Sequence, residues 1–178
     1  MTNDEWILVG QAKKGNAHAF ARLYQRYYQD LYRFALCYIR NAHAAEDAVM
    51  TSVLKAYEKI GELRKNDAFK SWLFQITANE CRRTLNQSSL YLEDVDFPEP
   101  QAEDSGYLTP EIQELLGTLS EAERLVVTLS VFGGYNSQEI AGLLHKRPGS
   151  IRSLKSRAMA SLREKLEKSN RKEVTSHE

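Results

Sequence analysis

One short segment divides the sequence and limits what the chain can fold into. Between Gln87 and Gly106 the apolar residues lose helical spacing, and residues 96–100 read Asp-Phe-Pro-Glu-Pro. A helix cannot pass through this stretch, because each proline removes a backbone donor and restricts the residue before it. The sequence therefore predicts an extended linker between two separate domains.

Before this segment, apolar residues recur at helical spacing in four stretches. The second stretch follows Asn16, a residue type that caps helix N-termini, and the third stops at Gly61. Four amphipathic helices of this kind are typical of one compact bundle. A short helix is predicted from about Asn3 to Lys14, and apolar stripes over residues 20–38, 45–60 and 69–77 mark the other three, of which the last starts near Asn66 and Asp67 and ends at Asn79, Arg82 and Arg83.

After the segment, three capping signals mark new helices. Thr109 is followed by a proline, and Ser120 and Asn136 each stand three residues before a glutamate, which is the spacing of a capping box. The last helix follows a turn over residues 145–147 and is expected to fray after Ser169. The expected fold class is all-α, with two small helical domains, residues 1–87 and 109–178, joined by an extended acidic linker, 88–108.

Charge is segregated along the chain although the formal net charge is zero. Residues 1–86 carry a net charge of +4 and residues 111–178 a net charge of +2. Residues 87–110 contain six acids and no base: Glu93, Asp94, Asp96, Glu99, Glu103 and Asp104. Two basic blocks separated by an acidic one are compatible with nucleic-acid binding, which the net charge alone disfavours.

Several classes of protein are disfavoured by what the sequence lacks. No apolar run approaches the ~20 residues of a membrane span, and the acidic start is unlike a signal peptide, so we expect a cytoplasmic protein without membrane insertion. Cys37 and Cys81 show no metal-ligand spacing, so two reduced cysteines are expected rather than a bridge or a zinc site. No nucleophile with an adjacent base and no phosphate loop is present, so neither an enzyme nor a cofactor is expected.

The second domain has the order of a helix-turn-helix: two short helices, a tight turn and a third helix. The third helix combines an apolar stripe of Ile151, Leu154, Ala158 and Leu162 with a polar front rich in Arg, Lys and Ser. Such a front suits base edges and phosphates, although solvated charges on a surface helix are the alternative. The predicted DNA-contacting residues are Lys146, Arg147, Ser150, Arg152, Ser153, Lys155, Ser156 and Arg157.

Motifs in both domains point to one family. In the first domain they are Ala45-Glu46-Asp47 and the pattern Phe69, Trp72, Leu73, Ile76, Asn79. In the second they are Leu119-Ser120 with Glu123-Arg124, then Gly134 to Ala141, and Pro148 to Ala158. Over about Ala19 to Leu166 the sequence resembles the extracytoplasmic-function sigma factors, the small two-domain branch of the bacterial sigma-70 family.

The resemblance implies a promoter-specific transcription initiation factor whose partners are bacterial core RNA polymerase, promoter DNA and an anti-sigma factor. It implies that the first domain recognises the minus-ten element, through Asn79, Arg82 and Arg83, and that the second recognises the minus-thirty-five element. Glu46 and Asp47 would bind polymerase, and the acidic linker would follow the RNA path of the polymerase. Trp72 could stack on a base, but its spacing with Phe69 and Ile76 favours plain packing.

Two positions depart from the family pattern and leave alternatives open. Met50 and Thr51 stand where the family usually has Gln and Glu, and Arg82-Arg83 is followed by uncharged residues instead of a dense basic cluster. A sigma-like decoy that binds an anti-sigma factor is one alternative. A stand-alone helix-turn-helix regulator is another.

Overall fold

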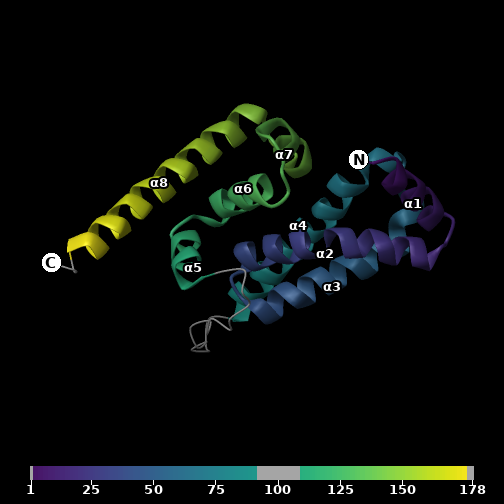
Figure 1. The fold of residues 1–178 in the computed structure, drawn as a ribbon, viewed down its shortest axis with the longest axis horizontal. Coiled ribbons are helices and arrows are strands. Elements are labelled where there is room, and N and C mark those ends of the chain that lie inside the picture. Colours follow the sequence, from purple (N-terminus) through teal and green to yellow (C-terminus); the bar gives the residue numbers. More distant parts are fainter. Residues whose placement is uncertain (1, 92–108, 176–178) are drawn as a thin grey trace. The chain divides into compact units, whose positions relative to one another are not determined.

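The structure, a computed structural model, describes residues 2–91 and 109–175, and the side chains of residues 2–87 and 109–168. The chain divides into two compact units, Met1–Gln101 and Ala102–Glu178. Every regular element within the described residues is a helix (Figure 1), which confirms the all-α prediction. None of the described helices combines the length and the apolar character needed to span a membrane.

The first unit is a bundle of four α-helices with two short 3-10 turns between the last two. Helix α1 packs on α2, α2 on α3, and α4 on both α2 and α3 (Figure 1). The core is aromatic: Phe34 and Phe74 are fully buried and their rings meet at 5.9 Å. The elements are α1 (Asn3–Lys13), α2 (Ala17–Ile39), α3 (Ala42–Lys59), η1 (Ile60–Glu62), η2 (Asn66–Ala68) and α4 (Phe69–Tyr91).

Local capping explains where α2 and α3 begin. The Asn16 side chain accepts from the amide of Ala19 at 3.0 Å, which confirms the predicted cap. Asn41 caps α3 in the same way, accepting from Ala44 at 2.8 Å, so the helix begins before Ala45, the first residue of its apolar stripe. Arg40 ends α2 with a positive φ of 67°.

Helix α3 exposes one large side chain and buries one polar side chain. Tyr57 is 44% exposed, whereas Ser52 is fully buried. Burial of Ser52 is tolerated because its hydroxyl donates to the carbonyl of Ala48 at 2.5 Å, which leaves the hydroxyl hydrogen-bonded inside the core.

Helix α4 continues past residue 87, where the sequence predicts the first domain to end. Nothing between Gln87 and Tyr91 stops a helix, since Pro98 is the first proline after α4 begins. The rest of the predicted linker, including Glu93, Asp94 and Asp96, lies outside the described residues.

The second unit contains α5 (Pro110–Gly117), α6 (Glu121–Val131), α7 (Ser137–Leu144) and α8 (Pro148–Thr175). Thr109 caps α5, and both predicted capping boxes, Ser120 with Glu123 and Asn136 with Glu139, are confirmed. Helix α8 packs on α5, α6 and α7, and α6 also packs on α7.

The turn between α6 and α7 is sterically tight. A Cβ atom on Gly133 would lie 2.5 Å from the Tyr135 ring and 2.6 Å from the Leu129 carbonyl oxygen. Gly134 has a φ of 70°, a conformation that favours glycine. The Gly-Gly pair therefore fixes how the chain enters α7.

Candidate nucleic-acid interfaces

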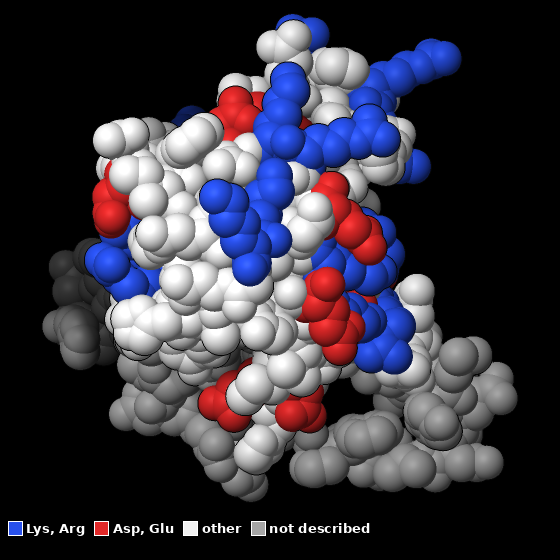
Figure 2. Space-filling view, turned by 90° about the vertical axis from the view of Figure 1, so that its right-hand side faces the viewer, with Lys and Arg blue, Asp and Glu red and all other residues white. Residues whose placement is uncertain are grey.

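Charge is mixed on one face of the molecule. On the face shown in Figure 2, Lys and Arg side chains lie beside Asp and Glu side chains along one side, and a broad uncharged area occupies much of the rest. The cations on this face form local groups rather than one continuous basic surface, so contacts with a polyanion there would depend on such groups.

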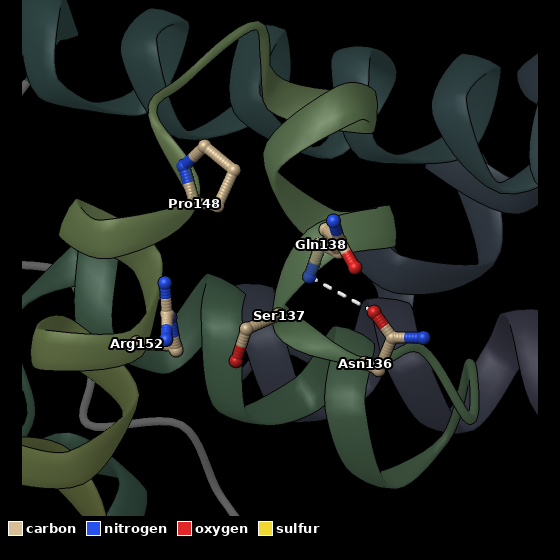
Figure 3. A pocket seen from close by; sticks show the side chains of 5 residues that line it. All are labelled: Asn136, Ser137, Gln138, Pro148 and Arg152. Carbon is tan, nitrogen blue, oxygen red and sulfur yellow. Dashed lines mark hydrogen bonds between the residues drawn. The ribbon is translucent and has the colours of Figure 1, made fainter.

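The first such group lies where α7 and α8 begin. A pocket of about 420 Å³ opens between the two helices and is lined by Asn136, Ser137, Gln138, Pro148 and Arg152. Ser137 comes from the start of α7 and Arg152 from the first turns of α8 (Figure 3). Asn136 occupies its own side chain in capping, accepting from Gln138 at 2.9 Å and from Glu139 at 3.0 Å.

This pocket has the chemistry of an anion site. Two helix N-termini carry the positive ends of their dipoles toward it, and Arg152 adds a full charge. The Arg152 side chain is exposed and has no hydrogen bond or ion pair to any residue that the structure describes. Its guanidinium is therefore available to a ligand outside the chain.

The burial of α8 fits a helix that docks by one side. Ile151 and Ala158 are buried against the unit, as predicted, while Leu154 and Leu162 are half-buried. The exposed members of the predicted minus-thirty-five set are Lys146, Arg147, Ser150, Arg152, Ser153, Ser156 and Arg157.

Lys155 differs from the rest of that set. Its side chain is half-buried, and its Nζ donates to the Ser130 hydroxyl of α6 at 2.5 Å. Arg157 also has a neighbour within the unit. Hydrogen bonds from Ser120 lower the pKa of Glu123, and the nearby charge of Arg157 lowers it further. The structure thus turns part of the predicted front of α8 toward α6.

A second cationic group lies in the first unit, between the 3-10 turns and α4. A cavity of about 340 Å³ is lined by Leu63, Arg64, Lys65, Ala68, Ser71, Trp72 and Gln75. Trp72 is half-buried and contacts Phe69, with ring centroids 6.1 Å apart. The expectation of plain packing for Trp72 is therefore only half right, because the indole also forms a wall of the cavity.

Arg64 and Lys65 are functional candidates that the sequence interpretation missed. Both are exposed, and neither side chain makes a hydrogen bond or ion pair within the described part of the chain. A basic pair between two predicted helices, a few residues before a tryptophan, was the available signal. What the sequence did not show is that the 3-10 turns place this pair and Trp72 around one cavity.

The predicted minus-ten residues continue along α4 from this cavity and contact other protein groups. Arg82 Nη1 donates to Asn79 Oδ1 at 3.4 Å, and Arg83 Nε donates to Glu80 Oε2 at 3.1 Å. Glu80 also accepts from Lys55 Nζ of α3. Burial alone would raise the pKa of Glu80, but the hydrogen bonds and charges of Lys55 and Arg83 hold it below its ordinary value.

The predicted polymerase-binding residues lie on an exposed side of α3. Glu46 and Asp47 are exposed, as their helical position predicts. The sequence interpretation missed the apolar strip that follows them: Met50 is 60% exposed, Leu54 58% and Tyr57 44%. Their spacing places them on one side of the helix, so an acidic start leads into a solvent-exposed apolar strip.

Neither cysteine behaves as a site. Cys37 and Cys81 are free and buried. Burial raises the pKa of each thiol to about 12, which disfavours the thiolate needed for a nucleophile or a metal ligand. Within the described residues no three His, Cys, Asp or Glu side chains group closely enough to hold a metal ion.

Two family descriptions match the two units of the chain. "Sigma-70 region 2" matches residues 23–90, and "Sigma-70, region 4" matches residues 110–162. The first match begins after α1.

Individual proteins are similar over most of the chain. The ECF RNA polymerase sigma factor SigM of Mycobacterium tuberculosis is 29% identical over 152 residues, which cover 83% of this chain and 77% of SigM. The ECF RNA polymerase sigma-E factor of Escherichia coli K12 is 26% identical over 179 residues, covering 90% and 93% of the two chains.

Two solved structures share the fold. The sigma factor RpoE of Bartonella quintana, in complex with the anti-sigma factor NepR, is 27% identical with a TM-score of 0.69, covering 82% of this chain and 97% of that one. CnrH, in complex with the cytosolic domain of CnrY, has a TM-score of 0.72 at 24% identity, covering 93% and 98%.

Proposed function

The chain belongs to the extracytoplasmic-function branch of the sigma-70 family, and we propose how its two units divide the work of a promoter-specific transcription initiation factor. The first unit binds core RNA polymerase and the minus-ten element, and the second binds the minus-thirty-five element. The observation that carries this proposal is the presence of regions 2 and 4 on one chain, each with exposed cations beside a pocket. The factor acts in the cytoplasm and directs the polymerase without catalysing a reaction itself.

For the minus-thirty-five element, α8 enters the major groove as a recognition helix. Arg152 reads a base edge, because it is exposed and a guanidinium can donate two hydrogen bonds to guanine. Lys146 and Arg147, in the turn before α8, contact phosphates, and the start of α7 at Ser137 receives another phosphate.

For the minus-ten element, the cavity beside Trp72 receives an unpaired base. A half-exposed indole offers a stacking face, and Arg64 and Lys65 can hold the adjoining phosphates. Asn79 and Arg82 extend the contact along α4. Arg83 contributes less than the sequence predicts, because Glu80 already holds it.

For polymerase, the surface consists of Glu46 and Asp47 with the apolar strip of Met50, Leu54 and Tyr57. Met50 replaces the glutamine usual in the family, so this contact relies more on apolar burial than on hydrogen bonds. A solved relative is bound by an anti-sigma factor, and we propose such a partner here, competing for the same surface. The acidic residues after α4 follow the RNA path of the polymerase.

Transcription in vitro with purified core polymerase tests the proposal. The full chain should support initiation on genomic fragments that the core polymerase alone does not transcribe. Sequence-specific binding of duplex DNA without initiation would favour a stand-alone regulator. Tight binding to a co-purified anti-sigma protein, with no initiation after its removal, would favour a decoy.

A further inference from the structure

Helix α1 lies outside the segment that matches region 2, yet it is firmly attached to the first unit. Arg26 of α2 pairs with Asp4, and the Tyr27 hydroxyl donates to the buried carboxylate of Glu5. Leu8 and Val9 add buried apolar contact. On its other side, α1 contacts both 3-10 turns, η1 and η2. It therefore connects the body of the bundle to the segment between α3 and α4.

Part of that connection is made by the side chain of Asn66, which forms two hydrogen bonds to α1. Its Nδ2 donates to the main-chain carbonyl of Trp6 at 3.2 Å, and its Oδ1 accepts from Lys13 Nζ at 3.3 Å. Gly10 lies between these partners on α1, and a Cβ added there would be 3.4 Å from Asn66 Nδ2. Asn66 thus lies across the helix backbone where α1 has no side chain.

Asn66 is also the direct neighbour of the cavity beside Trp72. Lys65 precedes it, Ala68 ends the same 3-10 turn, and both residues line the cavity. Asn66 itself does not line it. Contacts that hold Asn66 in place therefore also hold its neighbours Lys65 and Ala68, which form the wall of the cavity opposite α4.

We propose that Asn66 is a positioning residue, through which α1 holds the cavity in the shape that selects one unpaired base of the minus-ten element. This inference depends on the proposed role of the cavity. The physical reason is preorganisation: an exposed wall that is already held in place loses less conformational entropy on binding and adapts less readily to a wrong base. Asn66 acts through Lys65 and Ala68 and makes no DNA contact of its own.

The test is a base-selection experiment on the holoenzyme, assembled from core polymerase and the full chain. The probe is fork-junction DNA whose unpaired minus-ten positions are randomised, and the bound fraction is sequenced. For the wild type, the enrichment of the most favoured base in the bound fraction is divided by that of the least favoured base, at the position where the two differ most. Asn66→Ala should lower this ratio about three- to tenfold, a change of the size that one ordinary hydrogen bond contributes.

Matched variants separate positioning from folding. Lys13→Met should lower the base-selection ratio less than Asn66→Ala does. Asn66→Asp keeps the acceptor for Lys13 but not the donor to Trp6, so it should lower the ratio by an intermediate amount. Lys14→Met is the control, because Lys14 is exposed at the end of the same helix and is not bonded to Asn66. Polymerase affinity and binding to minus-thirty-five duplex should be unchanged in all of them.

Three outcomes would count against the inference. An unchanged ratio for Asn66→Ala, with a reduced ratio for Trp72→Ala, would overturn it and leave the minus-ten proposal standing. An unchanged ratio for both Trp72→Ala and Lys65→Ala would overturn both. Equal weakening by Asn66→Ala of base selection, polymerase binding and duplex binding would show a general structural role, which also overturns it.

Discussion

Lys155 of α8 and Ser130 of α6 are joined by a hydrogen bond of 2.5 Å between Nζ and Oγ. This bond turns a lysine from the predicted DNA-binding side of α8 toward its own unit. Three residues earlier, Arg152 is exposed at the pocket between α7 and α8. Two cations that look alike in the sequence therefore have different expected roles.

Arg152→Ala should weaken promoter binding by about 1–3 kcal/mol and relax base preference at one position of the minus-thirty-five element, because a bidentate base contact is lost. The measurement is holoenzyme binding to promoter variants with each base at each position. An equal loss on every sequence would instead identify Arg152 as a phosphate contact.

Lys155→Met should act on the fold rather than on DNA. We expect the free energy of unfolding to fall by about 0.5–1.5 kcal/mol, the contribution of one hydrogen bond. The slope of DNA affinity against salt concentration should not change. Urea denaturation and binding titrations at several salt concentrations measure the two effects. If the plot of log affinity against log salt concentration became shallower by about one, Lys155 would be a phosphate contact.

Glu80→Gln should destabilise the first unit, because Lys55 and Arg83 lose the carboxylate that they share. The same contact predicts a pH dependence. The pKa of Glu80 in the folded protein lies below its ordinary value of 4.5. Its stabilising contribution is therefore complete above pH 4.5 and lost as the pH falls through the lowered folded value.

Denaturation of wild type and Glu80→Gln as a function of pH checks this. The difference in unfolding free energy between the two proteins should be largest near neutral pH and should shrink below pH 4.5. A difference that stays constant into acid would show that the ionised form of Glu80 adds nothing to stability.

Met50→Ala with Leu54→Ala should lower the affinity for core polymerase at least tenfold, because both exposed side chains would be buried on binding. Competition against a labelled wild-type chain measures it. Ile7→Ala is a suitable control, since Ile7 is 45% exposed on α1, away from the strip on α3. If the control and the double variant bind equally well, the strip is not the polymerase surface.

The features that sequence predicts well here are those set by near neighbours in the chain. Asn16, Ser120 and Asn136 cap their helices through residues two or three positions away, so the sequence contains both partners. The all-α class and the order of the helix-turn-helix follow from the same local signals.

The features that the sequence missed depend on contacts between elements. The direction of Lys155 is set by Ser130 on α6, and the exposure of Trp72 by turns between α3 and α4. Arg64 and Lys65 become candidates only once the cavity is known.

The crowded turn at Gly133 has a consequence for how the chain can vary. The obstruction there includes the main-chain oxygen of Leu129, so trimming the Tyr135 ring would remove only part of it. Every change away from glycine adds a Cβ atom, and a second-site substitution of a side chain cannot move a carbonyl that belongs to α6. In a saturation mutagenesis screen position 133 should therefore tolerate nothing but glycine, whereas Val131, which is exposed two residues earlier, should accept many alternatives.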